Sequence, residues 1–249
     1  MTLRPPSILL IGPAGTGKTT STVTLLKAGL KVRMLATEPT APNRVIEEAT
    51  KRGISIQDFH WAFVGPTIAG WNSIVESAKL VNTLQLKDLA NMSTGIAKQD
   101  GGQGIKFIQT LAFFRSGRDK SEHGDVTEWG ADTAFVIDGF TGVSQMSRNL
   151  TVGLKPNPSP GEWGVMQSNI LTLMQKLCAD CQCFFVTIAH VERENNELTG
   201  LSNITVSTLG AKLAPKIPPL FTTVVYAKRL ADKFFWSTSE QGVDTKNGD

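Results

Sequence analysis

The sequence predicts an α/β protein with a mainly parallel central sheet flanked by helices. Short apolar runs of strand length alternate along the chain with longer stretches of helical spacing, which is typical of this class. The chain has 249 residues, of which 41% are hydrophobic, so it is long enough to bury a substantial core. We expect one domain over residues 1–236, followed by a polar tail over residues 237–249 that frays.

In the first half of the chain, expected strands and helices lie on both sides of a glycine-rich turn. Gly29 ends the first helical stretch, and Pro42 suits the first turn of the second. Residues 70–115 contain two further helical stretches separated by the glycine-rich residues 101–104. The expected strands are residues 7–11, 32–37 and 54–64, and the expected helices are residues 18–28 and 42–52.

The second half continues the alternation and ends at a sheet edge. Apolar residues recur at helical spacing over residues 163–179. The expected strands are residues 133–138, 183–189, 220–227 and 234–236, the last two closing one edge of the sheet. Two long polar connections are expected at residues 149–164 and 192–210, and connections of this length are usually functional or disordered.

Composition excludes several classes of protein. No apolar run reaches 18 residues, which argues against a membrane-spanning helix, and the N-terminal segment lacks the pattern of a signal peptide. Three clustered cysteines, Cys178, Cys181 and Cys183, do not form a secreted disulfide framework, so we expect a cytoplasmic location. Because no second cluster follows at zinc spacing, burial is the preferred explanation for these cysteines. A net charge of +3 permits nucleic-acid binding without establishing it.

A phosphate-binding loop is the strongest motif in the sequence. Residues 12–19, GPAGTGKT, match G-x-x-x-x-G-K-[ST] between an expected strand and an expected helix. Its glycines let successive backbone N–H groups face a phosphate, and the following helix adds its positive end. We expect Lys18 to reach the β- and γ-phosphates and Thr19 to ligate Mg²⁺. The expected nucleotide-binding residues are Gly12, Pro13, Ala14, Gly15, Thr16, Gly17, Lys18, Thr19 and Thr20.

Acidic and polar residues at other strand ends complete a candidate site for ATP and Mg²⁺. Asp138 ends the strand FVID and is the expected second metal ligand, with Asp132 a weaker candidate because it precedes the strand. Glu38 follows the second strand, and parallel strands align their carboxyl ends, so it is expected near the phosphate loop as the group that orients water. His190 caps a later strand and either senses the γ-phosphate or is a structural histidine.

The sequence as a whole resembles the RecA-like recombinase ATPases, and more closely the short phage-encoded RecA-like proteins associated with single-strand annealing and recombination. The motifs that carry the resemblance are GPAGTGKTT (12–20), TEP (37–39), GDVTEWGADTAFVIDG (124–139), FFVTIAHVE (184–192) and STLGAKLAPKIPPLF (207–221). They are distributed over most of residues 7–236. The phosphate loop alone is widely shared among protein families, whereas the later segments are more specific.

The resemblance implies a RecA-like ATPase core that assembles on single-stranded DNA as a ring or filament, with nucleotide between subunits. Glu38 is then the glutamate that polarises water, and His190 stands where RecA has a glutamine that reads the γ-phosphate. Residues 149–164 and 192–210 correspond to the two DNA-facing loops, although both are weakly basic here. A single-strand-binding protein is a further expected partner, and the location would be the host cytoplasm. Candidates for a basic residue acting on the neighbour's nucleotide are Lys212, Lys216, Lys228 and Arg229.

We expect no counterpart of RecA's large N-terminal polymerisation domain or of its C-terminal DNA-gathering domain, so filament formation and strand exchange do not follow from the resemblance. The alternatives are a helicase, helicase loader or packaging motor, and a nucleotide-gated DNA-binding module with negligible turnover. A small-molecule kinase ranks low because residues 192–199 offer only Arg193 in place of an arginine-rich lid. GTP remains an alternative to ATP, since no base-reading motif is visible. Trp129, Phe140 and Trp163 are more simply explained by burial than by stacking on bases.

Overall fold

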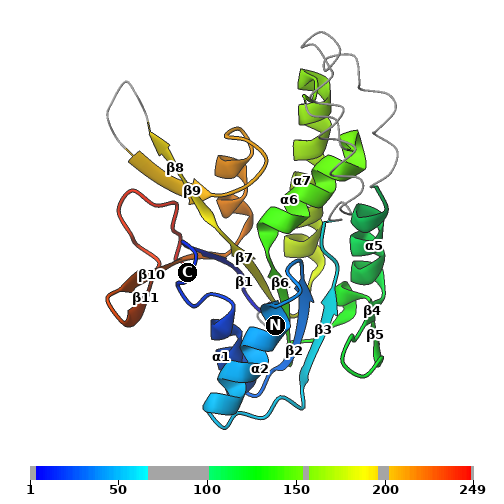
Figure 1. The fold of residues 1–249 in the computed structure, drawn as a ribbon, viewed down its shortest axis with the longest axis vertical. Helices are drawn as coiled ribbons and strands as arrows, with labels where there is room; N and C mark the ends of the chain where they lie inside the picture. Colours follow the sequence, from blue (N-terminus) through cyan, green and yellow to red (C-terminus); the bar gives the residue numbers. More distant parts are fainter. Residues whose placement is uncertain (1–3, 67–100, 154–156, 196–201, 248–249) are drawn as a thin grey trace, which may run out of the picture.

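The computed structural model describes residues 4–66, 101–153, 157–195 and 202–247. Its described residues form a seven-stranded central sheet in which six neighbouring strands are parallel and only the edge strand β11 is antiparallel. Helices cover both faces of this sheet (Figure 1), which confirms the predicted α/β class. The sheet order is β11 (Lys233–Ser237), β10 (Thr223–Leu230), β1 (Ser7–Ile11), β7 (Phe184–Ala189), β6 (Thr133–Asp138), β2 (Lys31–Ala36) and β3 (Phe59–Phe63).

Two apolar cores lie on opposite faces of the sheet. One contains buried side chains of the short helix α1 (Val23–Lys27) and of α2 (Ala41–Lys51). The other contains those of α5 (Gly101–Ala112), α6 (Phe140–Val152) and α7 (Pro160–Asp180). Because the inner strands are buried on both faces, they consist of continuous apolar residues rather than alternating ones.

The register of the parallel strands places four strand ends at one edge of the sheet. Ile11 is paired with Ala189, Asp138 with Ile188, and Ala36 with Asp138. The residues that follow β1, β7, β6 and β2 therefore meet at this edge. Since β7 lies between β1 and β6, the residue after β7 stands between the phosphate loop and Asp138.

The helical stretch after the phosphate loop differs from the expected helix over residues 18–28. Regular structure starts with a 3₁₀ turn, η1 (Thr20–Thr22), and α1 then covers only five residues. The N–H of Ser21 nevertheless donates to the carbonyl of Gly17 at 2.9 Å, so helical bonding already begins inside the loop. The helix dipole therefore contributes less to phosphate binding than a long helix would.

The glycine-rich residues 101–104 do not separate two helices as expected, because they form the first turn of α5. The rest of the expectation for residues 70–115 falls mainly on residues 67–100, which lie outside the described residues. Residues 114–124 instead contribute a small two-stranded sheet of β4 (Phe114–Arg115) and β5 (Glu122–Gly124).

Both expected polar connections are shorter than predicted. In the first, α6 continues to Val152 and α7 begins at Pro160, because Ser159 and Glu162 form a capping box. The sequence SPGE carries that signal, which the helical-spacing argument missed. In the second, β8 (Val191–Asn195) and β9 (Ser202–Val206) pair with each other as the two antiparallel strands of a hairpin.

The polar tail was expected to fray but packs against the sheet. Val243 forms a β-bridge with Ile204, and Lys246 forms one with Val224. The Lys246 ammonium also donates to the carbonyl of Phe221 at 3.0 Å. Backbone pairing and the packing of Val243 against the apolar core therefore hold the tail, although Val243 is the only apolar side chain in residues 237–249.

Candidate nucleotide-binding site

The phosphate loop joins β1 to η1 in a conformation that requires glycine. Gly15 and Gly17 have φ angles of 74° and 77°, in the left-handed region that side chains disfavour. A Cβ atom on Gly12 would collide with the carbonyl oxygen of Ala227 on the neighbouring strand β10. The motif glycines thus permit both the curl of the loop and its close contact with the sheet.

Lys18 lies inside the curl of this loop. Its side chain is only 6% exposed, and Nζ donates to the carbonyl oxygens of Gly12 and Pro13, each at 2.7 Å. Burial lowers the pKa of the ammonium to about 8, while the negative charges of Asp138 and Glu38 oppose that shift. The group therefore remains mostly protonated at neutral pH and places a cation at the centre of the loop.

Asp138 and Thr19 have the donor set expected of a magnesium site. The Thr19 side chain hydrogen-bonds to the Asp138 carboxyl, which is 6% exposed. Within the described part of the chain, Asp138 Oδ2 is buried without a hydrogen-bond partner. Burial is the main cause that raises the pKa of this carboxyl to about 6. A buried carboxylate oxygen beside a hydroxyl suits Mg²⁺, which takes oxygen ligands and often only one or two from carboxylates.

Glu38 is held near Asp138 by the residue that precedes it. Thr37 donates from Oγ1 to the carbonyl of Gly139 at 2.8 Å, and its N–H donates to the carbonyl of Asp138 at 2.9 Å. Gly139 has a φ of 103°, and a Cβ atom on either Gly139 or Gly142 would collide with the Thr37 side chain. These contacts hold the ends of β2 and β6 together, which positions Glu38 beside Asp138.

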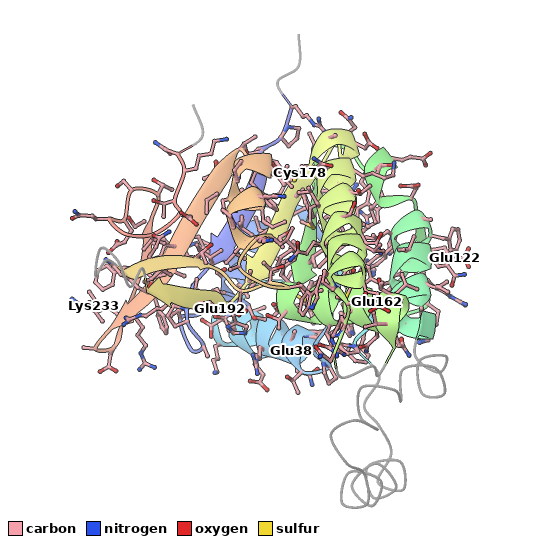
Figure 2. The ribbon with its side chains drawn as sticks, turned by 90° about the horizontal axis from the view of Figure 1, so that it is seen from above. Glu38, Glu122, Glu162, Cys178, Glu192 and Lys233 are labelled. Carbon is pink, nitrogen blue, oxygen red and sulfur yellow. The ribbon has the colours of Figure 1, made fainter. Side chains whose placement is uncertain are left out.

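The Glu38 carboxylate is half-exposed and faces α2. Its Oε2 lies 3.9 Å from Nη1 of Arg44, which is also half-exposed. Figure 2 shows Glu38 beside the light-blue helix α2, which follows β2 along the chain. Sequence reasoning did not select Arg44, although its place in the first turn of the helix after the TEP segment was a usable signal.

His190 follows β7 and stands between the loop and Asp138, as the sheet order requires. Burial and the nearby Lys18 charge lower the pKa of its imidazole, and Glu38 partly offsets this effect. The ring is therefore neutral at pH 7 and interacts as a hydrogen-bonding group rather than as a cation. Its backbone carbonyl accepts from the N–H of Ser207 at 2.8 Å, just after β9.

These groups line one cleft of about 560 Å³, within the usual range for a ligand site. The structure thus brings residues 14–20 of the predicted loop together with Asp138, Glu38 and His190, whereas Gly12 and Pro13 of that loop are not among the residues that line the cleft. Phe234, on β11, also lines the cleft and was not selected from sequence. The lining residues are residues 14–20, Glu38, Arg44, Asp138, Gly139, residues 188–190 and Phe234.

The four basic candidates for a role in a neighbouring subunit lie outside the lining of this cleft, as far as the described residues go. Lys212 and Lys216 are exposed near η3 (Ala214–Lys216). Lys228 is paired with Glu240 at 2.7 Å, and Arg229 is paired with Asp232 and also packs over the ring of Phe234. Lys228 and Arg229 line a separate hollow on the other side of the phosphate loop.

Of the described helices, none is long and apolar enough to cross a membrane. No family model and no curated protein matches the chain. Among solved structures, the crystal structure of the RadB recombinase aligns with 98% of this chain and 92% of its own, at 14% identity and a TM-score of 0.47. The assignment of the site rests on the geometry of the cleft.

Proposed function

We propose that this protein is a Mg²⁺-dependent ATPase of the RecA-like type that binds single-stranded DNA and assists recombination or strand annealing as a homo-oligomer. The observation that carries the ATPase assignment is the meeting of a phosphate loop, a buried aspartate bonded to the loop threonine, and a glutamate in one cleft. Each group supplies a different requirement of phosphoryl transfer to water.

Each group in the cleft has a different role in binding or hydrolysis. Loop N–H groups and Lys18 bind the β- and γ-phosphates, while Thr19 and Asp138 hold the metal. When bound, Mg²⁺ neutralises charge that develops on the β- and γ-phosphate oxygens. Glu38 orients and deprotonates the attacking water, for which its partial exposure leaves room.

The position of His190 supports a coupling between nucleotide binding and DNA binding. Its ring lines the nucleotide cleft, and the next residue, Val191, begins the β8–β9 hairpin. The bond from Ser207 to the His190 carbonyl ties the end of the same hairpin to this position. A shift of His190 on γ-phosphate binding would therefore move both ends of the hairpin, which is one of the two candidate DNA-facing segments and carries the exposed Arg193.

One observation favours a second candidate, a nucleotide-gated DNA-binding module with negligible turnover. The Arg44 guanidinium faces the Glu38 carboxylate at 3.9 Å and competes with water for it. ATP hydrolysis measured with and without single-stranded DNA separates the two functions. We expect DNA to stimulate hydrolysis by wild type, and Glu38→Gln to keep nucleotide binding while slowing turnover by about 10²- to 10⁴-fold.

Lys18→Ala is the loss-of-binding control, since it removes the cation at the centre of the loop. If wild type and Glu38→Gln both bind ATP but neither hydrolyses it with DNA present, the binding module is the correct function. Unwinding of duplex DNA without a partner protein would indicate a helicase instead. Measuring the size of the assembly in the same samples tests whether the protein is a homo-oligomer. If the affinity for DNA does not weaken as the salt concentration rises, binding through the DNA phosphate backbone is contradicted.

A further inference from the structure

Two aromatic side chains on β11 form an exposed wall beside the phosphate loop. Phe234 and Trp236 alternate along the strand and therefore share one face of it. They are 56% and 50% exposed, which is high for such large apolar groups. A Cβ atom on Gly17 would lie 3.3 Å from the Phe234 ring, so this ring packs directly on the loop.

The wall borders a second hollow that continues the phosphate cleft. This hollow has a volume of about 570 Å³ and shares Thr16, Gly17, Thr20 and Phe234 with the cleft. Trp236 lines only the second hollow. The opposite side is formed by Glu48 and Arg52, an ion pair with a separation of 2.6 Å on the last turn of α2 and the residue after it.

The direction of the bound nucleotide follows from the positions of the reacting groups. Asp138, Glu38 and His190 mark the end of the cleft where the terminal phosphate reacts, and none of them lines the second hollow. The nucleoside then leaves the loop toward one of the two hollows that adjoin the loop and that these groups do not line. Thr20 lines both the cleft and the second hollow, so the cleft continues directly into that hollow.

We propose that this hollow is the nucleobase subsite, in which the flat heteroaromatic ring of the nucleotide stacks on Trp236 and is bordered by Phe234. The inference rests on the proposed function, because it takes a nucleoside triphosphate on the loop as given. Aromatic faces stack on any base, and the Glu48 carboxylate adds a hydrogen-bond acceptor at the rim. The hollow on the other side of the loop offers only Tyr226, which is 8% exposed and has no free ring face of comparable size.

Trp236→Ala tests the proposal, with equilibrium binding of Mg²⁺–ATP and of Mg²⁺–tripolyphosphate as the two measurements. Tripolyphosphate occupies the loop but has no base. We expect the variant to weaken ATP binding by about 5- to 150-fold, as for loss of one aromatic–base stack, and to leave tripolyphosphate binding unchanged. Trp236→Phe keeps a ring and should restore most of the ATP affinity.

Phe235→Ala is the matched control. Phe235 lies on the same strand and is 41% exposed, but it points to the opposite face. It should change neither affinity. If Trp236→Ala weakens the binding of ATP and of tripolyphosphate equally, the proposed subsite is overturned, because Trp236 would then support the phosphate loop rather than contact the base. Unchanged ATP binding, with or without a change in assembly size, would overturn it as well.

The proposed function fails in a distinguishable way. A wild-type protein that binds neither ATP nor tripolyphosphate lacks a working phosphate loop, whatever Trp236 does. A wild-type protein that binds both equally well gains nothing from the base, and in that case the loop functions and the subsite does not exist.

Discussion

Replacing Asp138 with asparagine should stabilise the protein when nucleotide and metal are withheld. The carboxyl is 6% exposed, and its Oδ2 finds no partner among the described residues. Its pKa rises from an ordinary value of 3.8 to about 6, chiefly through burial. At about 1.4 kcal/mol per pH unit, the ionised group costs the fold about 3 kcal/mol at pH 7 relative to a neutral acid. Because the new amide also lacks full hydrogen bonding, we expect a net gain of about 1–3 kcal/mol for Asp138→Asn.

The same shift predicts how the effect depends on pH. Since the folded-state pKa lies above the unfolded-state value, the folded protein holds more protons between pH 4 and pH 6. Wild-type stability from this group is therefore greatest at low pH and falls as pH rises through that window. The amide does not titrate, so the advantage of Asp138→Asn should shrink as pH falls from 7 to 4.

Denaturant unfolding in the presence of EDTA measures both effects, and adding Mg²⁺–ATP measures the functional cost. Wild type should gain about 2.7 kcal/mol at a ligand concentration 100 times Kd, whereas Asp138→Asn should gain much less. Asp132→Asn is the matched control, because Asp132 lies just before the same strand in an exposed pair with Lys31. Its effect should be under about 1 kcal/mol. A loss of stability in Asp138→Asn at pH 7 without ligand would refute the reasoning.

Two further substitutions test the local geometry by denaturant unfolding. Gly139→Ala should lower the free energy of unfolding by at least about 1–2 kcal/mol, because φ is 103° and the added carbon would collide with Thr37. As a control, Gly164→Ala lies in open space on α7 and should raise the free energy of unfolding by about 0.5–1 kcal/mol. If Gly139→Ala leaves the free energy of unfolding unchanged, the contact between Thr37 and Gly139 does not hold the ends of β2 and β6 tightly together. Ser159→Ala should cost about 1 kcal/mol by removing the N-cap that accepts from Glu162, and a neutral result would mean that the capping box contributes nothing to α7.

Sequence reasoning succeeded where the signal was local. The phosphate loop requires glycine at fixed spacing, and those glycines adopt the left-handed angles that the motif implies. Strands such as β1 and β6 were found because burial on both faces demands continuous apolar residues. The helix boundary at Pro160 was missed although its capping box was present, since helical spacing alone defines helix ends poorly.

The sequence by itself predicted a triphosphate-binding loop and showed which acids end the neighbouring strands. Only the tertiary structure decided that Asp138 touches Thr19, that Thr37 locks Glu38 beside it, and that Phe234 reaches the loop from β11. The reason is physical: these contacts join residues about 100 to more than 200 positions apart, and strand order and register set them rather than any local preference.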